Sequence, residues 1–425
     1  MLDIHRIRNE TESVKNGLVS VGSDPSVIDN VLVLDGDRRE TQKEGDRLRA
    51  ELNAASRNIG KEKDPDRRKD LIDAVSKVKQ AIKNNDVRVP LLEKELRDLM
   101  LSIPNIPLRE VPVGSGDEAN AVASEHGDKP SFDFEPKPHW DLMSDLGIID
   151  FERGQKVSGS RFYFLRGAGA RLQRALITWM LDVHTEEHGY EELYAPCMVR
   201  AECLVGTGNL PKFGEHLYRD IEEDFWFIPT GEVPVTNFYR EEILDWKELP
   251  LRHVTYTPCF RREKMSHGKD NRGIKRGHQF DKVELVQFVH PDRGRDALDE
   301  LTGHARKLLE MLGLAHRVVN ICTGDLSFVS AIKFDLEAWS PGCEEWLEVS
   351  SCSLFQDFQA RRAKIRFKDE SGKNHFVHTL NGSGLALPRV VISIIESYQR
   401  ADGSVTVPRV LQPYMGGLEV ITRRN

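Results

Sequence analysis

Long apolar runs are missing from this chain, because stretches such as Val390–Ile395 are far shorter than the about 20 residues that cross a bilayer. The N-terminus is charged from its third residue and lacks the apolar region of a secretory signal. A basic excess is also missing, since 60 Lys and Arg stand against 68 Asp and Glu, a net charge of −8. These absences predict a cytoplasmic protein without membrane contact, in which nucleic-acid binding is confined to local basic patches.

Cysteine is scarce, and the six cysteines form no metal-binding pattern. The sequence contains no Cys-x-x-Cys pair and no Cys/His group with zinc spacing. The cysteines are therefore predicted to be buried or half-buried free thiols. The glycine-rich signatures G-x-G-x-x-G and G-x-x-x-x-G-K-[ST] are missing too, so a nucleotide site here is neither of the Rossmann nor of the P-loop type.

What the chain does contain is enough apolar material for folded domains. Its 425 residues are 39% apolar and 30% charged, and that length corresponds to about three domains. Shifts in composition suggest an N-terminal domain at 1–107, a linker at 108–138 and a C-terminal domain at 139–425. The linker assignment rests on a stretch rich in glycine, serine, aspartate and proline.

Two long heptad-like patterns dominate residues 34–99. The first runs through Leu34, Arg38, Thr41, Gly45, Leu48, Leu52, Ala55 and Ile59, and the second through Leu71, Val75, Val78, Ile82, Asn85, Val89, Leu92, Leu96 and Leu99. The break at Gly60–Arg67 contains a glycine and a proline and is expected to reverse the chain. The patterns therefore predict an antiparallel helical hairpin about 45 Å long, at 1.5 Å per residue. Pro90 is expected to kink or split the second helix.

Two interpretations of this hairpin remain open. An oligomerising coiled coil would use the same patterns, whereas the returning second helix favours pairing within the chain and leaves the charged faces for a partner. Cationic side chains gather near the tip. On these residues alone a solvated charged surface is the simpler interpretation, and RNA binding is the alternative. The candidate RNA contacts are Lys61, Lys63, Arg67, Arg68, Lys69 and Lys77.

The C-terminal part mixes short β-rich runs with helices. Helices are expected at Ala170–Glu187 and Ala386–Gln399. Strands are expected at Arg161–Leu165, Phe225–Pro229, Val283–Val289, Leu347–Ser351 and Phe376–Leu380. Because strands and helices do not alternate regularly, the pattern favours an α+β domain on a mainly antiparallel sheet.

Two neighbouring motifs carry groups suited to a nucleotide. FRRE (260–263) places an arginine on a strand, where its planar cation can bind phosphate or carboxylate. A basic loop from Lys264 to Lys275 follows, and RGHQF (276–280) ends in Phe280, which can lie under a flat base. Taken alone, FRRE is more typical of an ordinary surface ion pair.

Three further motifs carry anion-binding or metal-binding groups. In Asn381–Arg389, two glycines are expected to form a tight turn that directs backbone N–H groups and Arg389 toward an anion. In LEVSS (347–351), Glu348 and Ser350 are expected on one strand face, where a carboxylate beside hydroxyls suits Mg²⁺. In Ile228–Asn237, a threonine and a glutamate are expected to share a strand face.

The order and spacing of these motifs resemble those of class II aminoacyl-tRNA synthetases, and further segments resemble the bacterial-type seryl-tRNA synthetases in particular. Besides the hairpin, these segments are IPNIP, KPHWDLM, LGIIDFERG, VSGSRFYFLRG, GTGNLPKF, IPTGEVPVTN, RGHQFDKVELVQF, LEVSSCS and NGSGLALPR. The resemblance extends from the first residues to PYMGG near the end. It implies a class II catalytic domain on an antiparallel sheet, and a homodimer formed through the helix from Ala170 and the segment after it.

The resemblance also implies an activity. L-serine would be activated with ATP and Mg²⁺ and transferred to tRNA(Ser), and also to tRNA(Sec). The hairpin would bind the long variable arm of the tRNA. A separate editing domain has no counterpart in the sequence, so threonine would be refused for lack of space.

Roles for individual residues follow from the same resemblance. The serine-binding set would be Thr230, Gly231, Glu232, Arg261, Glu284 and Ser383. The ATP-binding set would be Arg261, Arg262, Glu263, Arg276, Gly277, Phe280, Glu348, Val349, Ser350, Ser351 and Arg389. Glu348 and Ser351 would hold Mg²⁺. Gly231 and Arg262 depart from the residues usual in the family, alanine and a small polar residue.

Two other functions fit the same motifs less well. A ligase that transfers activated amino acids to a carrier protein is disfavoured by the full-length hairpin, which that substrate would not need. A non-catalytic RNA-binding or regulatory relative would be expected to have lost Arg261, Glu348 or Arg389, and all three are present.

Overall fold

The structure is a computed structural model that describes residues 1–264 and 272–423. The chain divides into two compact units, one formed by Met1–Val19 with Ser23–Pro104 and the other by Ser20–Gly22 with Asn105–Asn425. Most of the expected basic loop between Lys264 and Lys275, namely residues 265–271, lies outside the described residues. None of the helices in the described part is both long and apolar enough to cross a membrane.

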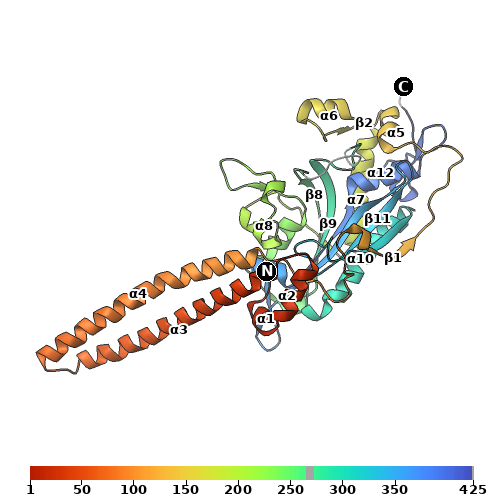
Figure 1. Cartoon of the computed structure of the whole chain (residues 1–425). Coiled ribbons are helices and arrows are strands. Elements are labelled where there is room, and N and C mark those ends of the chain that lie inside the picture. Colours follow the sequence, from red (N-terminus) through yellow and green to blue (C-terminus); the bar gives the residue numbers. More distant parts are fainter. Residues whose placement is uncertain (265–271, 424–425) are drawn as a thin grey trace. The chain divides into compact units, whose positions relative to one another are not determined.

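The first unit contains the predicted hairpin. Helices α3 (Val27–Ile59) and α4 (Pro65–Leu101) lie antiparallel along each other (Figure 1). Every position of the two heptad-like patterns is buried or half-buried, while the intervening charged positions are mostly exposed. The chain reverses at residues 60–64, where the Asp64 side chain caps α4 by accepting from the backbone N–H groups of Asp66 and Arg67. The two helices therefore pair with each other, as expected.

Polar residues set the spacing halfway along the hairpin. Asn85 on α4 donates its Nδ2 hydrogen to the Thr41 carbonyl oxygen on α3 at 2.9 Å. A Cβ at Gly45 would lie 3.2 Å from Asn85 Nδ2, so the glycine leaves room for this contact. The expectation that Pro90 splits the second helix is wrong, because α4 continues through it. Pro90 lies on the exposed face, where water can bind the carbonyl that the ring leaves unpaired.

Two short helices, α1 (Ile4–Asn9) and α2 (Thr11–Ser20), precede the hairpin in the first unit. Asp35 of α3, which is 2% exposed, accepts from Arg8 Nε at 2.6 Å and from Arg38 Nη2 at 3.1 Å. Arg38 thus occupies a seam position because it pairs with this buried carboxylate.

An eight-stranded sheet forms the centre of the second unit, in the order β1-β10-β11-β12-β15-β9-β8-β4. All neighbouring strands are antiparallel except β4 and β8, which are parallel. The strands are β1 (Ala121–His126), β10 (His316–Asn320), β11 (Ile332–Ser340), β12 (Glu345–Gln356), β15 (His378–Ala386), β9 (Gln279–Val289), β8 (Leu251–Phe260) and β4 (Glu191–Glu192). The expected linker 108–138 contains β1, which hydrogen-bonds to β10 at the sheet edge.

The two faces of the sheet carry different cores. Helices α7 (Ala168–Glu186), α10 (Gly294–Met311) and α12 (Leu387–Ser397) pack on one face, in the largest apolar core (Figure 1). On the opposite face, α9 (Glu232–Thr236) and α11 (Phe358–Ala363) contact a smaller core, and α8 (Ala201–Thr207) packs against both helices. The α+β class on a mainly antiparallel sheet is therefore confirmed.

The remaining elements are short. They are α5 (His139–Asp145), α6 (Phe151–Ser158), β2 (Ile149–Asp150), β3 (Phe164–Leu165), β5 (Met198–Val199), β6 (Trp226–Phe227), β7 (Ile243–Asp245), β13 (Arg366–Lys368), β14 (Asn374–Phe376), β16 (Val405–Thr406) and β17 (Val420–Ile421). All six cysteines are free and buried or half-buried, as predicted.

Candidate active site

Alternation along strand β9 places polar groups on the face opposite the largest core. Val283, Leu285 and Val289 point into that core. Lys282 and Glu284 belong to the other face, which farther along the strand packs Val286 and Phe288 into the smaller core. Buried charges in a strand of this kind need partners, and the neighbouring strands β12 and β15 supply them.

A cavity of about 700 Å³ opens over this polar part of the sheet. A second cavity of about 190 Å³ shares part of its wall. Of the residues singled out in the sequence, the larger cavity is lined by Thr230, Glu232, Arg261, Glu263, Arg276, Glu348, Ser351 and Ser383. The smaller one adds Gly277, Phe280, Val349, Ser350 and Arg389. Residues from distant parts of the sequence therefore converge here.

Two buried glutamates lie beside the larger cavity. Glu232 lines it, whereas Glu284 lines neither cavity and is bonded to residues that do. Glu284 is fully buried; its Oε2 accepts from Thr230 Oγ1 at 3.1 Å and is ion-paired with Lys282. Glu232, 9% exposed, accepts from Gln359 Nε2 at 2.5 Å. Asn381 Nδ2 joins the two carboxylates, at 2.9 Å from Glu232 and 3.0 Å from Glu284.

Burial and the neighbouring Glu284 carboxylate raise the pKa of Glu232 to about 7. Glu232 therefore changes charge near neutral pH, and a cation placed beside it would favour the ionised form. Such a site suits an ammonium group, which can donate hydrogen bonds to a carboxylate and a hydroxyl at once.

The expected strand through Thr230 and Glu232 is wrong. Glu232 begins the short helix α9, and Thr230 and Gly231 form the turn before it. Gly231 lies close to the sheet, because a Cβ there would be 2.8 Å from Thr255 Cγ2 and 3.1 Å from Glu284 Cβ. Because Gly231 lets the chain approach the sheet closely, Thr230 can hydrogen-bond to Glu284 although it precedes a helix and is not part of a strand.

A β-bulge in β12 places Glu348 on the wall of the larger cavity. Glu348 pairs with Glu337 and Ser350 pairs with Leu336, so Val349 is an extra residue in β12. The bulge shifts the alternation, and Glu348 and Ser351 both line the larger cavity. Ser350, expected beside Glu348, is 1% exposed and donates to the Ser383 carbonyl oxygen at 2.6 Å.

Cations surround Glu348. Arg389 Nη1 donates to its carbonyl oxygen at 2.7 Å and lies 3.3 Å from its Oε2. Desolvation in the pocket opposes ionisation, but Arg389, Lys333 and Arg261 outweigh it and lower the pKa of Glu348. The carboxylate is therefore ionised at neutral pH.

Arg261 lies where β8 ends. Its backbone N–H donates to the His278 carbonyl oxygen at 2.9 Å, and its Nε donates to the Pro229 carbonyl oxygen at 3.2 Å. The guanidinium lies 5.0 Å from the centre of the Phe280 ring. This cation and this aromatic face thus occupy one wall of the pocket. Arg276 Nη1 lies 3.5 Å from Glu263 Oε2 on the same side.

Arg262 does not share this placement. The Arg262 side chain is exposed and lines neither of the two cavities. Its backbone N–H donates to the His216 carbonyl oxygen at 3.0 Å. Successive residues at the end of a strand point to opposite sides, which separates Arg262 from Arg261.

The expected glycine turn before the last helix is also wrong. Gly382 and Gly384 lie within strand β15. A Cβ at Gly382 would be 2.2 Å from Leu301 Cδ2, and one at Gly384 would be 2.5 Å from His184 Nε2. The glycines thus permit α10 and α7 to pack against one face of the strand. Ser383, which lies between the two glycines in the sequence, faces the cavity on the other side. Arg389 lies in the first turn of α12, as expected.

Sequence reasoning missed several polar partners in the site. Lys282 lies two residues before Glu284 on one strand, and Asn381 two residues before Ser383, so alternation could have found both. Gln359 is on α11, more than a hundred residues from Glu232, and no local pattern announces it. Lys333 of β11 also lines the cavity.

Two family models match the chain. Residues 1–107 match the seryl-tRNA synthetase N-terminal domain. Residues 215–398 match the tRNA synthetase class II core domain (G, H, P, S and T).

Relatives match over the whole length. The chain is 52% identical to a serine–tRNA ligase of Herpetosiphon aurantiacus over 99% of this chain and 100% of the relative. It is 51% identical to that of Roseiflexus sp., with complete coverage of both. The crystal structure of seryl-tRNA synthetase from Pyrococcus horikoshii complexed with ATP has a TM-score of 0.96 at 37% identity, covering 100% of both chains. The cytoplasmic serine–tRNA ligase of Naegleria fowleri in complex with AMP has a TM-score of 0.89 at 33% identity, covering 100% of this chain and 99% of that one.

Proposed function

The chain belongs to the seryl-tRNA synthetases, class II enzymes that attach serine to tRNA with ATP, and from that premise we propose which of its residues perform the reaction. The observation that supports the proposal is the convergence of arginines, carboxylates and hydroxyls from the end of β8 and from α9, β12, β15 and α12 on two adjoining cavities.

ATP would bind in the two cavities, against the wall formed by Arg261 and Phe280. Phe280 would stack on adenine, with Glu263 at the edge of the base and the backbone at Gly277 beside it. Arg261 would bind the α-phosphate and the serine carboxylate. Arg276 and Arg389 would hold the far end of the triphosphate, and both line the smaller cavity. The guanidinium forks of arginines suit phosphate oxygens.

Glu348 and Ser351 fit a magnesium ion bound together with the phosphates. An ionised carboxylate and a hydroxyl line the same wall. Mg²⁺ typically takes one or two carboxylates and completes its shell with phosphate oxygens and water. When bound, the ion would neutralise phosphate charge.

Serine would bind at the two buried glutamates. Thr230 and Glu232 would receive its ammonium group, and Glu284 and Ser383 would contact its side-chain hydroxyl. Polar groups that are left unpaired reject analogues without the hydroxyl by about 10⁴-fold or more. Gly231, which packs against Thr255 between Thr230 and Glu232, is assigned to the same serine site.

The chemistry needs positioning more than proton transfer. In the first step the serine carboxylate displaces pyrophosphate at the α-phosphorus, and the arginines hold the reacting groups in line and offset their charge. In the second step the terminal ribose hydroxyl of the tRNA attacks the carbonyl carbon of the seryl adenylate; the ester forms, AMP leaves, and the hydroxyl proton passes to the departing phosphate. We assign no side chain as a general base in either step.

The pH dependence of serine use tests the assigned ammonium site. Only ionised Glu232 binds an ammonium ion well, and the pKa of Glu232 in the free enzyme is about 7. We therefore expect kcat/KM for serine in ATP–pyrophosphate exchange to rise as the pH increases through about 7. Glu232→Gln is expected to lower kcat/KM by about 30-fold or more, the loss of a charge-assisted hydrogen bond. It should also flatten the pH profile.

The stability of the free enzyme provides an independent control. Because the folded-state pKa of Glu232 lies above the unfolded value of 4.5, its contribution to stability falls as the pH rises from 4.5 to about 7. Glu232→Gln should remove this fall in thermal unfolding experiments. An unchanged serine profile in the variant would contradict the assignment.

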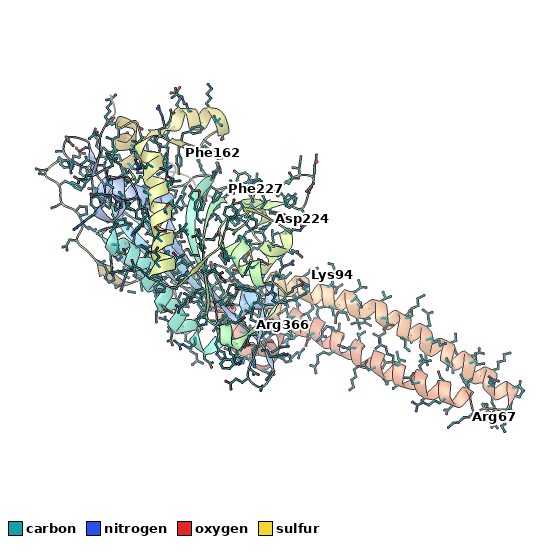
Figure 2. The ribbon with its side chains drawn as sticks, turned by 180° about the vertical axis from the view of Figure 1, so that it is seen from behind. Arg67, Lys94, Phe162, Asp224, Phe227 and Arg366 are labelled. Carbon is teal, nitrogen blue, oxygen red and sulfur yellow. The ribbon has the colours of Figure 1, made fainter. Side chains whose placement is uncertain are left out.

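The hairpin is proposed to bind the tRNA, with residues 1–107 as the tRNA-binding part, 108–138 as the connection and 139–425 as the catalytic part. Lys61, Lys63, Arg67, Arg68, Lys69 and Lys77 are all exposed. Figure 2 shows Arg67 at the tip of the hairpin. If the variable arm is what it recognises, tRNA(Sec) would be charged with serine as well as tRNA(Ser), in the cytoplasm.

A homodimer formed through α7 and the segment after it is part of the proposal. Two large apolar residues of that segment are exposed, Tyr194 at 101% and Met198 at 53%. Light scattering is expected to give twice the chain mass of 48.4 kDa. Tyr194→Arg should shift the mass toward one chain, whereas Ile221→Ser, at another exposed apolar residue, should not. A monomeric wild-type protein would contradict the dimer.

A further inference from the structure

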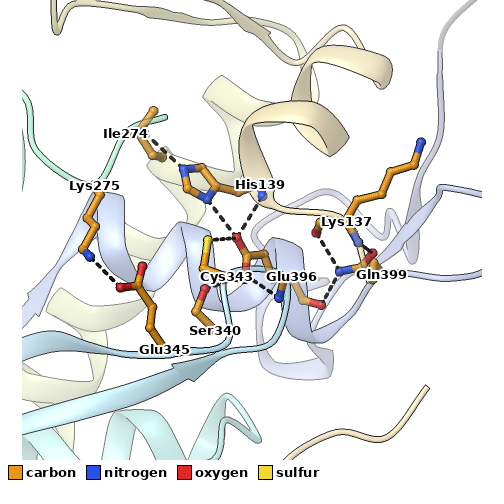
Figure 3. Close-up of polar contacts among 10 residues, drawn as sticks. Lys137, His139, Ile274, Lys275, Ser340, Cys343, Glu345, Glu396 and Gln399 are labelled. Carbon is orange, nitrogen blue, oxygen red and sulfur yellow. Dashed lines mark hydrogen bonds and ion pairs between the residues drawn. The ribbon is translucent and has the colours of Figure 1, made fainter. Parts of the chain in front are cut away.

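A buried carboxylate on α12 lies outside both cavities. Glu396 is 0% exposed, and its two oxygens receive hydrogen bonds from three segments (Figure 3). Oε1 accepts from the backbone N and the Nδ1 of His139, each at 2.8 Å, and from Cys343 Sγ at 3.3 Å. Oε2 accepts from Ser340 Oγ at 2.5 Å and from the backbone N of Gly342 at 2.8 Å and of Cys343 at 3.2 Å.

These donors fix the protonation of the group. Burial alone would raise the pKa of Glu396, but the hydrogen bonds from His139 and Ser340 outweigh it and lower the pKa. Burial and the adjacent carboxylate raise the pKa of Cys343 to about 12, so its thiol remains a donor. Since Oε1 of an ionised carboxylate only accepts, His139 Nδ1 carries a hydrogen.

The other ring nitrogen of His139 faces residues 273–274, near the C-terminal end of the basic loop. The backbone N–H of Ile274, which is 1% exposed, donates to His139 Nε2 at 3.3 Å (Figure 3). A Cβ at Gly273 would lie 1.9 Å from Nε2, so the glycine permits this contact. One imidazole thus joins α12 to residues 273–274.

Both ends of this connection lead to the nucleotide pocket. Ile274 lines the smaller cavity, as do Arg276 and Gly277 two and three residues after it. Arg389 precedes Glu396 on α12 by about two turns, roughly 10 Å at 1.5 Å per residue. Lys275 Nζ lies 2.7 Å from Glu345 Oε2 at the start of β12, which ties the same segment to the strand of Glu348.

We propose that His139 is a positioning residue that sets the separation of Arg276 and Arg389, and thereby the binding of the ATP triphosphate. This inference rests on the proposed function of that pocket. His139 touches no substrate; it acts through the Ile274 backbone on one side and Glu396 on the other.

A metal ion is the rival explanation, because ligand atoms of His139, Cys343 and Glu396 lie within 4.8 Å of one another. The contacts favour hydrogen bonding. The Cys343 thiol is protonated, and His139 Nδ1 carries a hydrogen, so neither is in the form that binds a metal. Each Glu396 oxygen already accepts three hydrogen bonds.

The imidazole can be changed without undocking α5. The backbone N–H of His139 donates to Glu396 whatever the side chain. Next to it, the Lys137 N–H donates to Gln399 Oε1 at 2.7 Å, and Gln399 Nε2 donates to the Lys137 carbonyl oxygen at 3.1 Å. These backbone contacts hold the start of α5 on α12.

The test compares His139→Asn with His139→Ala in the full-length enzyme. The asparagine amide can donate to Glu396 from near the Nδ1 position but is too short to accept from Ile274. His139→Asn is therefore expected to unfold near the wild-type temperature, while KM for ATP in serine-dependent exchange rises about tenfold, the effect of one lost positioning contact. KM for serine should change by less than about twofold. His139→Ala should lower the unfolding temperature and raise KM for ATP.

Three results would overturn the inference. The first is an unchanged KM for ATP in His139→Asn, provided that the wild-type enzyme is active. The imidazole would then have only a structural role. The second is an equal rise of both KM values. The third is stoichiometric metal in purified wild-type protein that is lost in His139→Asn. A wild-type enzyme without serine-dependent exchange would instead refute the proposed function itself.

Discussion

Replacing Arg389 by alanine is expected to reduce serine-dependent ATP–pyrophosphate exchange by about 10³-fold or more, the cost of removing a preorganised cation from a developing phosphate charge. Arg389 is the cation closest to Glu348, at 3.3 Å, and lies in the first turn of α12 on the wall of the smaller cavity. Under the proposed assignment its loss would remove one of the cations that hold the triphosphate, and it also removes the main counter-charge of the Glu348 carboxylate.

Two matched variants separate charge from geometry. Arg389→Lys keeps the charge but not the planar fork, so it should retain part of the activity. Arg409→Ala removes an exposed arginine at the start of a short helical turn outside both cavities and should leave exchange unchanged. Thermal unfolding of all three should stay near that of the wild type. Normal exchange in Arg389→Ala would contradict the placement of the triphosphate.

Shortening the hairpin is expected to abolish tRNA charging while leaving amino-acid activation intact. Asn85 and Thr41 face each other across the helices at 2.9 Å, so residues 42–84 can be removed and the ends joined by a short turn. The pocket residues all belong to the other compact unit. Exchange without tRNA should therefore stay within about twofold, whereas kcat/KM for tRNA should fall by about 10³-fold, as phosphate contacts are lost.

A charge variant serves as the control for the shortened chain. Changing Lys61, Lys63, Arg67, Arg68, Lys69 and Lys77 to glutamine leaves the seam positions untouched. It should weaken tRNA charging and reduce its dependence on salt, because fewer counterions are released. Replacing Lys94, which pairs with Asp98 near the other end of α4, should have little effect. Undiminished charging by the shortened enzyme would show that the hairpin does not bind the tRNA.

The hairpin could be predicted from the sequence because its determinants are local and repeated. Charged positions alternate with seam positions over many turns, and the reversal is marked by a glycine and a proline. Even its exceptions have local causes: Arg38 pairs with a buried aspartate three residues away, and Gly45 leaves space for Asn85.

The conformations of the site motifs were predicted less well, because tertiary packing decides them. The bulge at Val349 brings Glu348 and Ser351 to one face, which simple alternation does not give. Gly382 and Gly384 mark the close approach of two helices to a strand and not a turn. Thr230 and Glu232 act from the start of a helix.

Contacts between residues far apart in the sequence were not predicted. Gln359 reaches Glu232 across 127 positions, and His139 reaches Ile274 across 135. Such contacts depend on which elements the fold brings together, and no spacing within a motif encodes them. Motif order identified the chemical groups of the site, and the fold supplied the residues that hold those groups in place.

The most direct test of the central claim is ATP–pyrophosphate exchange measured with each amino acid in turn, without tRNA. Exchange is expected with serine. Alanine should be weaker by about 10⁴-fold or more because it leaves polar groups of the pocket unpaired, and threonine should be weaker because its methyl group lacks space. Stronger exchange with any other amino acid, or none with serine, would contradict the claim.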